Sequence, residues 1–430
     1  GSVLRCASDG TISRDEVQAR LDAQDYVGRP LRSGARMYRI QYETTRATGA
    51  PGYSAAAIFL PDNRRASKVP AIVVSHGSRG QAGKCAPSLV DPSAVEVNDD
   101  QERAVLTMVG AGFPVIAPDL AGFAGYGSDG VPPSGYNSAE DGARSTLDAA
   151  RAVRSLLGDA LLDQVVLTGH SQGGHLALSS LALAERYAPD VNVGAVATFV
   201  PNWLTQRTWA ALFALAGRYT FTKSPTPNAV SIWYHYTQAE LLDGPGGAAE
   251  VFGPDKLAGV KKFVDETCWG PPYPLLEAIG TILTDVFSKE FTAAVMGPAT
   301  FGSDCAGEDS VKAICEKWMA RYQADRPHLT GKATEVPILI NYGGKDDSLE
   351  PARFQCGVDR LLEDGANLSY CFLREGTHGE LPAMLGDYTA DWIANQILGE
   401  RMEASCPSTE LGLVNSNGKP VTCATPPPND

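Results

Sequence analysis

Two hydrophobic patterns alternate along the chain: continuous apolar runs, and segments with apolar residues at helical spacing. Together they predict strands that alternate with helices. Continuous apolar runs, typical of strands covered on both faces, occur at 69–77 (VPAIVVSHG) and 113–120 (FPVIAPDL). Further runs of this kind lie at 164–169, 194–201, 336–344 and 369–376. Residues 138–157 instead begin with a Ser-x-x-Asp cap and place apolar residues at helical spacing. Strands and helices in this order predict an α/β fold with a mostly parallel, doubly wound sheet.

Four other segments complete this pattern. Residues 36–45 (RMYRIQYETT) and 54–61 (SAAAIFLP) have a β-rich, partly alternating character and predict an antiparallel hairpin at the edge of the sheet. Residues 99–112 predict a helix that is closed by a glycine. The stretch 381–402 has apolar residues at helical spacing and predicts one last amphipathic helix.

One long interval departs from the alternation. Between Pro201 and Val336 the pattern is mostly helical, and we predict no strand there. A structureless loop of this length is implausible in a compact domain. We therefore predict a discontinuous main domain at 1–201 and 336–405, a helical cap or lid inserted at 202–335, and an irregular, disulfide-stapled tail at 406–430.

Charge excludes one class of partner. The 430 residues include 36 basic and 50 acidic ones, which gives a net charge of −14. Nucleic-acid binding relies on Lys and Arg that neutralise phosphates, so we expect no nucleic-acid partner. No apolar run reaches the roughly 18 residues that a membrane-spanning helix needs. The oligomeric state is left open by these features.

Nine cysteines bear on the compartment. They form no C-x-x-C pair and no histidine cluster accompanies them, so we expect no zinc or other metal site. Scattered cysteines in a chain with 29 prolines and 44 glycines favour the disulfides of an exported protein over reduced, buried thiols. We predict three local pairs: Cys356–Cys371, Cys406–Cys423 and Cys305–Cys315. The chain begins with Gly-Ser, which is typical of a cloning remnant. We therefore expect that a signal peptide was removed and that the protein is secreted or held in the cell envelope.

The stretch VVLTGHSQGGHLALSS (165–180) places one serine between a predicted strand and a predicted helix. Gly169 and Gly173 remove side-chain bulk around Ser171, as the strand–turn–helix of a nucleophile elbow requires. The hydroxyl would project from the carboxyl edge of the sheet, with the partial positive charge of a helix N-terminus behind it. We predict that Ser171 is a nucleophile; the alternative is a glycine-rich turn with an unreactive serine.

A serine nucleophile needs a base that a carboxylate holds in place, and the expected chain order is Ser, then Asp or Glu, then His. Of the six histidines, His378 follows the last predicted strand and precedes the last helix, where a loop can bring it to Ser171. Asp347, in NYGGKDDSLEP, follows the preceding strand. We predict His378 as the base and Asp347 as its carboxylate. Asp346 is the alternative acid, with helix capping as its expected role.

The loop VVSHGSRG (73–80), after the first buried strand, predicts the groups that would stabilise an oxyanion. The backbone N–H of Gln172, next to the nucleophile, is one expected donor, and that of Ser78 is the second. We expect His76 to be a structural histidine of the turn.

Three blocks of sequence carry a resemblance to a known family. They are APDLAGFAGYGS (117–128), LDAARAVRSLL (147–157) and GHSQGGHLALSSLALAERYAPD (169–190). Through them the chain resembles the α/β-hydrolases and, within these, the secreted lipases and esterases of the secretory lipase family.

This resemblance implies an α/β-hydrolase fold with a helical cap after the strand that follows the elbow. It also implies a triad of Ser171, Asp347 and His378, an Asp148–Arg151 pair on the helix before the elbow, and no cofactor. The cap sequence departs from the family's pattern, so a preference for acyl length is not carried over. The HGSRG loop differs from the oxyanion loops of typical lipases, so the resemblance supports Gln172 as an oxyanion donor more than it supports Ser78.

The expected activity is hydrolysis of carboxylic esters through an acyl-enzyme on Ser171. The substrate would be a small-molecule, lipid or polyester ester, with transient contact at a lipid interface. A peptidase or amidase and an acyltransferase on the same fold are the alternatives, followed by a hydrolase fold kept as a binding protein. We expect most aromatic residues of 202–335 to form the core of the cap and a smaller set to line an acyl or aromatic pocket.

Overall fold

A nine-stranded sheet organises the part of the chain that the structure describes. This structure is a computed structural model, and it describes residues 1–89, 100–127, 130–203, 206–301, 304–349, 351–414 and 418–423. The strands are β1 (Val3–Ile12), β2 (Ala35–Thr45), β3 (Pro51–Pro61), β4 (Val69–Ser75), β5 (Val115–Pro118), β6 (Leu161–His170), β7 (Asn192–Phe199), β8 (Ile338–Gly343) and β9 (Leu368–Leu373). Their order is β1-β2-β3-β5-β4-β6-β7-β8-β9.

The sheet has an antiparallel and a parallel part. From β1 to β5 the neighbouring strands are antiparallel, and β2 and β3 form the predicted hairpin in a continuous register from Ala35–Pro61 to Thr45–Pro51. From β5 through β4, β6, β7 and β8 to β9 every pair is parallel. The predicted α/β fold with a mostly parallel sheet is therefore confirmed.

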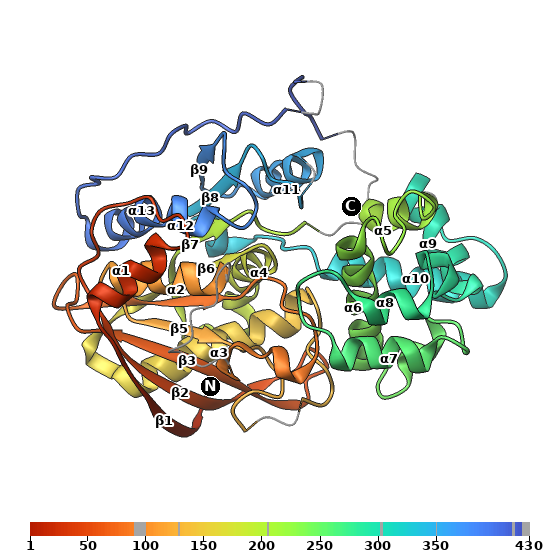
Figure 1. Cartoon of the computed structure of the whole chain (residues 1–430), viewed down its shortest axis with the longest axis horizontal. Helices are drawn as coiled ribbons and strands as arrows, with labels where there is room; N and C mark the ends of the chain where they lie inside the picture. The colour runs from red at the N-terminus through yellow and green to blue at the C-terminus, as the bar shows by residue number, and fades with distance from the viewer. Residues whose placement is uncertain are drawn as a thin grey trace.

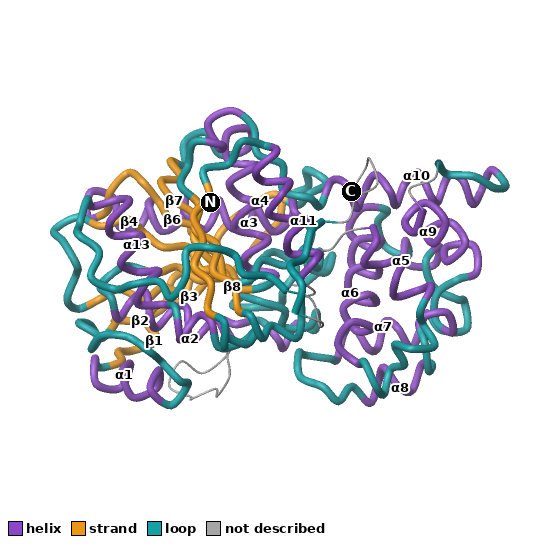
Figure 2. Tube along the Cα trace, turned by 90° about the horizontal axis from the view of Figure 1, so that it is seen from above, coloured by secondary structure: helices purple, strands orange, loops and turns teal. Residues whose placement is uncertain are grey.

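Helices cover both faces of this sheet. Figure 2 shows α3 and α4 on one side and α1 and α2 on the other. The helices outside the long interval are α1 (Arg14–Asp22), α2 (Asp100–Gly110), α3 (Ala139–Leu157), α4 (Gln172–Tyr187), α11 (Pro351–Glu363), α12 (Leu381–Met384) and α13 (Gly386–Leu398). The predicted helix at 99–112 corresponds to α2, although its residue 99 lies outside the described part. The single predicted helix at 381–402 is wrong, because two helices, α12 and α13, occupy that stretch.

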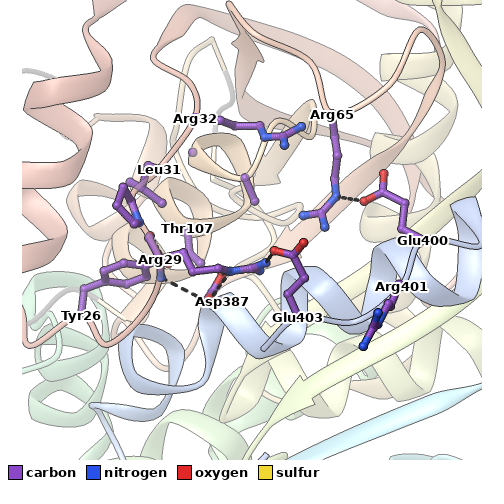
Figure 3. A pocket seen from close by; sticks show the side chains of 13 residues that line it. Tyr26, Arg29, Leu31, Arg32, Arg65, Thr107, Asp387, Glu400, Arg401 and Glu403 are labelled. Carbon is purple, nitrogen blue, oxygen red and sulfur yellow. Dashed lines mark hydrogen bonds and ion pairs between the residues drawn. The ribbon is translucent and has the colours of Figure 1, made fainter. Parts of the chain in front are cut away.

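An ion-pair cluster ties α13 to the N-terminal region. Arg29 pairs with Asp387 at 2.8 Å and with the buried Asp391 at 2.7 Å, and Arg65 also pairs with Asp391, at 2.6 Å. Figure 3 shows Arg29, Arg65 and Asp387 around a cavity of about 300 Å³. A buried carboxylate is tolerated where cations compensate it, and two guanidinium groups do so at Asp391.

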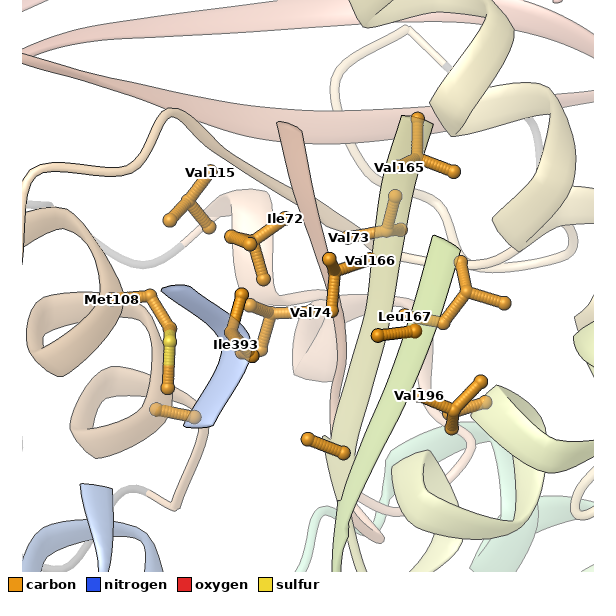
Figure 4. Close-up of a cluster of buried hydrophobic side chains, with 14 of the residues drawn as sticks. Ile72, Val73, Val74, Met108, Val115, Val165, Val166, Leu167, Val196 and Ile393 are labelled. Carbon is orange, nitrogen blue, oxygen red and sulfur yellow. The ribbon is translucent and has the colours of Figure 1, made fainter. Parts of the chain in front are cut away.

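The main hydrophobic core fills the space between the central strands and their helices. Ile72, Val73 and Val74 of β4 and Val166 and its neighbours in β6 are completely buried (0% exposed). Figure 4 shows these side chains directed to both faces of the strands, with Met108 of α2 and Ile393 of α13 packed near them. Burying one such side chain contributes roughly 1.5–3 kcal/mol. This core explains why continuous apolar runs, rather than alternating ones, mark the central strands.

The long interval forms a lobe of helices, which we call the insertion (residues 202–335). Its helices are α5 (Gln206–Ala214), α6 (Pro225–Leu242), α7 (Leu257–Glu266), α8 (Pro274–Ile279), α9 (Lys289–Phe301) and α10 (Asp309–Ala324). Figure 1 shows them together beside the body of the molecule, which contains the sheet. In the described part of the insertion no strand is present, as predicted. The division of the chain into domains at these boundaries stays a prediction.

The insertion has a hydrophobic core of its own, made largely of aromatic rings. His235 lies at its centre, with the rings of Phe291 and Trp318 within about 5 Å of it (5.2 and 5.1 Å). Its Nε2 hydrogen-bonds the hydroxyl of Tyr322 at 2.8 Å, and burial lowers the pKa of His235 to about 3. Most aromatic residues of the insertion are therefore core residues, as expected; Trp269 is an exception and is 44% exposed.

Four disulfides are present in the described residues, and the predicted pairs are only partly right. Cys305–Cys315 is confirmed. Cys356–Cys371 and Cys406–Cys423 are wrong, because the pairs are Cys356–Cys423 and Cys371–Cys406. The fourth, Cys85–Cys268, links the body to the insertion, and Cys6 is free and exposed.

The physical reason for the wrong pairs is the path of the tail. The tail returns to the body and runs beside β9, where the Phe372 N–H donates to the Ser408 carbonyl at 2.8 Å. Each tail cysteine therefore meets a cysteine of the body instead of the other tail cysteine. Residues 415–417 and 424–430 of the predicted tail lie outside the described residues. Across the described helices, none combines the length and the apolar character needed to span a bilayer.

Candidate active site

Ser171 lies at the sharp turn between β6 and α4. Its backbone has φ 54° and ψ −114°, a left-handed conformation that costs about 1–3 kcal/mol for a residue with a side chain. Three hydrogen bonds hold this conformation in place. The Ser171 N–H donates to the Phe199 carbonyl at 2.9 Å, and the Ser171 carbonyl accepts from Asn202 N–H at 2.9 Å and from His175 N–H at 3.1 Å.

The two glycines of the elbow are required by close backbone contacts. A Cβ at Gly169 would lie 2.3 Å from the carbonyl carbon of Gly173. A Cβ at Gly173 would lie 2.0 Å from the Ser75 carbonyl oxygen. Neither contact is possible for a real side chain, so the G-x-S-x-G spacing follows from the packing of β6 and α4 against the end of β4. The geometry of a nucleophile elbow is present, and the nucleophilic role of Ser171 stays a prediction.

The partner of His378 is Asp346 and not Asp347. The Nδ1–H of His378 donates to Oδ2 of Asp346 at 2.8 Å, and the Asp346 side chain is completely buried (0% exposed). Asp347 is exposed and accepts a hydrogen bond from the Ser348 hydroxyl at 3.3 Å. The predicted pairing of His378 with Asp347 is therefore wrong, and the alternative acid takes its place.

The turn after β8 explains which of the two aspartates faces His378. The Asp346 N–H donates to the Gly343 carbonyl at 3.2 Å, and the Lys345 N–H donates to the Gly376 carbonyl at 3.0 Å. This tight turn directs Asp346 toward the loop that carries His378 and leaves the next residue in solvent. A count of residues from the end of the strand does not reveal such a turn.

Asp346 is held as a carboxylate. Burial raises the pKa of Asp346, but the hydrogen bond and charge of His378 and the N–H groups of Leu349 and Ser348 (each 2.8 Å from Oδ1) lower it below its ordinary value. A carboxylate can only accept, so Nδ1 of His378 carries the ring proton. The other nitrogen, Nε2, is then the basic one, as a general base requires.

His170, the residue that directly precedes Ser171, contacts His378. The His170 Nε2 lies 2.7 Å from the His378 carbonyl oxygen, and the two imidazole rings meet edge to face at 4.6 Å. Since His170 directly precedes Ser171, this contact places His378 beside the elbow. Among the described residues no direct hydrogen bond joins Ser171 to His378. Such bonds are often long in a free enzyme and shorten in its complexes.

The loop that follows β4 runs against the elbow from the other side. A Cβ at Gly173 would lie 2.8 Å from the His76 carbonyl oxygen, which shows how close this loop comes. Ser78 is half-buried, and its hydroxyl hydrogen-bonds that of the buried Tyr136 at 2.6 Å. Gln172 begins α4, whose first N–H groups have no acceptor inside the helix. The roles of the Gln172 and Ser78 N–H groups as oxyanion donors stay predictions.

The other histidines have structural surroundings. His76 is completely buried and hydrogen-bonds the carbonyls of Gly77 and Asp119, in agreement with its expected structural role. His175 is buried inside α4, and burial lowers its pKa to about 4. His328 is exposed and pairs with Asp364 at 2.6 Å.

The Asp148–Arg151 pair implied by the family resemblance is present and structural. The two side chains lie 2.9 Å apart on α3. Asp148 also accepts hydrogen bonds from the hydroxyls of Thr44 and Tyr187, at 2.7 and 2.6 Å. The pair therefore fastens α3 to the antiparallel part of the sheet and to the end of α4.

Within the described ranges, no three residues of the types His, Cys, Asp and Glu gather into a group that could hold a metal ion. The expectation that the reaction needs no metal or cofactor stays a prediction. Two contacts near the site were not predicted: His170 with His378, and Tyr136 with Ser78. For His170 the sequence offers a weak signal, a polar side chain at the end of a buried strand; for Tyr136 it offers none.

Comparisons with solved structures show how widely this fold occurs. A protein from Legionella pneumophila has a TM-score of 0.69 at 16% identity, and the match covers 94% of this chain and 100% of that one. The rice cell wall degrading esterase LipA from Xanthomonas oryzae has a TM-score of 0.64 at 17% identity, with 93% and 98% covered. Candida antarctica lipase A has a TM-score of 0.61 at 15% identity, with 98% and 87% covered. At these identities the likeness shows a shared fold alone.

A match to the model of a protein family identifies the family of this chain. The search of curated proteins found no match. The model of the alpha/beta hydrolase family, however, matches residues 72–344, from β4 to the turn after β8 and more than half of the chain. The matched range contains the elbow of Ser171. The chain therefore belongs to the alpha/beta hydrolase family.

Proposed function

We propose that this protein is an exported serine hydrolase that cleaves carboxylic esters, with Ser171 as nucleophile, His378 as general base and Asp346 as the carboxylate that orients His378. The observation that carries the proposal is the 2.8 Å hydrogen bond from Nδ1 of His378 to the buried Asp346, beside the left-handed turn at Ser171. This bond leaves Nε2 of His378 as the base at the same edge of the sheet where the serine is held.

The reaction proceeds in two halves. In the first, Oγ of Ser171 attacks the ester carbonyl carbon while Nε2 of His378 takes the hydroxyl proton, and a tetrahedral oxyanion forms. The oxyanion collapses, the C–O bond to the alcohol breaks, and the alcohol leaves with the proton from His378. In the second half, water gives a proton to His378 and attacks the acyl-enzyme, and the carboxylic acid leaves as Ser171 regains its proton.

The oxyanion would be stabilised by backbone groups at the elbow. The N–H of Gln172 lies at the start of α4, where the helix dipole favours negative charge. The N–H of Ser78 is the proposed second donor, on the loop that contacts Gly173. Loss of one donor of this kind typically costs about 3 kcal/mol in the barrier.

Proteins of the same fold and the disulfides support the ester class and the location. Two proteins that share the fold are named as an esterase and a lipase. The four disulfides agree with an exported protein. We propose a small-molecule, lipid or polyester ester as substrate, transient contact with lipid interfaces, and the insertion as a cap that limits access to Ser171.

The direct test removes the proposed nucleophile. We expect Ser171→Ala to lower hydrolysis of a short p-nitrophenyl ester by a factor of about 10⁴ or more without a change in thermal stability. Ser180→Ala, which removes a buried hydroxyl two turns along the same helix, is the matched control and should keep its activity. Hydrolysis that persists in Ser171→Ala would contradict the proposal.

A substrate panel then separates ester hydrolysis from the alternatives. Aminoacyl amides cleaved faster than matched esters would indicate a peptidase or amidase. Transfer of the acyl group to an added alcohol in preference to water would indicate an acyltransferase. We expect esters to be the best substrates and water the main acceptor.

A further inference from the structure

We propose that His170 is a positioning residue for the reaction: it fixes the loop of the base by donating a hydrogen bond to the backbone carbonyl of His378. This inference rests on the proposed function, in which His378 is the general base. It adds a role for a side chain that precedes the nucleophile and takes no part in the proton transfers described above.

The contact joins the two halves of the site. His170 is the last residue of β6 and is only 5% exposed. Its Nε2 lies 2.7 Å from the carbonyl oxygen of His378, 208 residues further along the chain. A carbonyl oxygen can only accept, so Nε2 of His170 carries a proton in this contact. The strand that holds the nucleophile is thus bonded to the loop that holds the base.

A second contact restricts the orientation of the base itself. The imidazole rings of His170 and His378 meet edge to face, with centroids 4.6 Å apart and planes inclined by 62°. On its other side, the ring of His378 is bonded to Asp346 through Nδ1. Three contacts therefore hold His378. The carboxylate of Asp346 holds Nδ1, the ring of His170 packs against the imidazole, and Nε2 of His170 binds the backbone carbonyl.

The carbonyls of the base loop (residues 376–379) are fixed by three different elements. The Gly376 carbonyl accepts from the Lys345 N–H of the turn after β8, at 3.0 Å. The Gly379 carbonyl accepts from Nη1 of Arg103 in α2, at 2.5 Å. The carbonyl of His378 itself is held by His170. Of the three, the bond from His170 acts on the residue that carries the base.

This arrangement has a kinetic consequence. A displacement of about 1 Å in a catalytic group can reduce the rate by roughly 100-fold, because the barrier depends on alignment. If the bond from His170 sets the place of Nε2 of His378, its loss should reduce kcat and leave KM almost unchanged. A residue that only contributes packing would instead affect stability, or kcat and KM together.

The experiment compares three substitutions in the full-length protein. His170→Gln keeps an amide N–H at about the position of Nε2, whereas His170→Asn is too short to place one there and His170→Phe keeps a ring without a donor. We expect kcat for a p-nitrophenyl ester to fall roughly 10- to 100-fold in His170→Phe and His170→Asn, with KM within about twofold of wild type. His170→Gln should recover most of kcat. His328→Phe replaces an exposed histidine outside the proposed triad and is the control; its kcat and KM should match those of wild type.

Two further readouts make the result decisive. The low-field proton NMR signal of the His378 Nδ1–H should shift or broaden in His170→Phe and return in His170→Gln, and thermal unfolding shows whether each variant is folded. The inference would be overturned if all three variants had the same kcat as one another, or if kcat of His170→Gln were no higher than that of His170→Asn. If His170→Phe does not fold, the Gln and Asn pair decides. Ser171→Ala and Asp346→Ala, assayed alongside, report on the proposed function separately, because activity in them would contradict the triad itself.

Discussion

The body and the insertion of this molecule have separate hydrophobic cores of different composition. The body is held by aliphatic side chains of parallel strands, and all three groups of the proposed triad belong to it. The insertion has a separate core of stacked and edge-to-face aromatic rings around His235. The comparison teaches that the groups of the proposed triad lie at the strand ends of the sheet and the turns that follow them, whereas the insertion is stabilised by a core that does not contain them.

The two regions are nevertheless joined next to the elbow. The Cys85–Cys268 disulfide links the loop after β4 to the insertion. In the same place the Trp269 N–H donates to the Arg79 carbonyl at 2.8 Å. Tyr136, whose hydroxyl hydrogen-bonds that of Ser78, donates its backbone N–H to Oγ1 of Thr237 in α6, at 2.9 Å. The insertion is thus attached to the loop that carries the proposed second oxyanion donor.

A second junction lies at the far end of the insertion. Asp325, directly after α10, accepts a hydrogen bond from the Ala139 N–H at the start of α3, at 2.8 Å. It also accepts from Tyr234 and Gln238 of α6, each at 2.7 Å. One buried carboxylate therefore connects two helices of the insertion to a helix of the body.

The largest effect should come from the acid of the body. We predict that Asp346→Asn lowers kcat about 10⁴-fold, because an amide no longer fixes the His378 tautomer or stabilises its imidazolium. Asp347→Asn, at the adjacent exposed position, should stay within about twofold of wild type. Steady-state kinetics on both variants checks this prediction, and a large loss in Asp347→Asn with little in Asp346→Asn would contradict it.

The next effect should separate two disulfides. Cys85 and Cys268 lie 183 residues apart and cross between the regions, whereas Cys305 and Cys315 lie 10 residues apart within the insertion. On loop length alone, removal of the first pair by double Ala substitution should cost about 5 kcal/mol of unfolding free energy and removal of the second about 3 kcal/mol.

Only the first double variant should also lower kcat, because only it releases the loop of Ser78. Urea unfolding and ester kinetics measure the two effects. Equal kcat losses in both double variants would show that the crossing link has no special relation to the site.

A smaller effect should come from backbone contact at the elbow. Gly173→Ala places a Cβ 2.0 Å from the Ser75 oxygen, so the elbow must shift, and we predict a loss of activity of roughly 100-fold. Gly217 of the insertion has no atom within 4 Å of such a Cβ, and Gly217→Ala should change stability by less than about 0.5 kcal/mol. An active, stable Gly173→Ala would show that the close approach is not needed.

The smallest effect concerns pH and the second junction. Burial raises the pKa of Asp325 to about 7 from an ordinary value of 3.8. The folded chain therefore keeps this proton over a range where the unfolded chain has lost it, so the stability it contributes is complete below about pH 4 and falls as the pH rises to about 7. The slope is about 1.4 kcal/mol for each pH unit at most.

Asp325→Asn cannot ionise, so its unfolding free energy should lack this decline. Asp309→Asn, at an exposed position of α10, should keep it. Chemical unfolding of the three proteins at pH 4, 5.5 and 7 measures the difference, and parallel curves for wild type and Asp325→Asn would contradict the prediction.

The sequence predicted the central fold because burial on both faces leaves a direct trace, as in the apolar runs that became β4 and β5. It did not predict β1, because this edge strand is mostly exposed and carries no continuous apolar run. Motif and chain order led to Ser171 and His378, whose catalytic roles stay predictions. The predicted partner of His378 was wrong by one residue, because the tight turn from Gly343 to Asp346 sets which aspartate faces His378. Two predicted disulfides were wrong for a similar reason: the tail packs beside β9, and this tertiary contact cannot be predicted from the spacing of the cysteines.

Covalent labelling tests the central claim most directly. A phosphonate ester that reacts with activated serine hydroxyls, followed by intact-protein and peptide mass spectrometry, reports which side chain is nucleophilic. We predict one adduct for each chain, located on Ser171, formed much more slowly in Asp346→Asn and absent in Ser171→Ala. An adduct on another residue, or an enzyme that hydrolyses esters while Ser171 stays unmodified, would contradict the proposed triad.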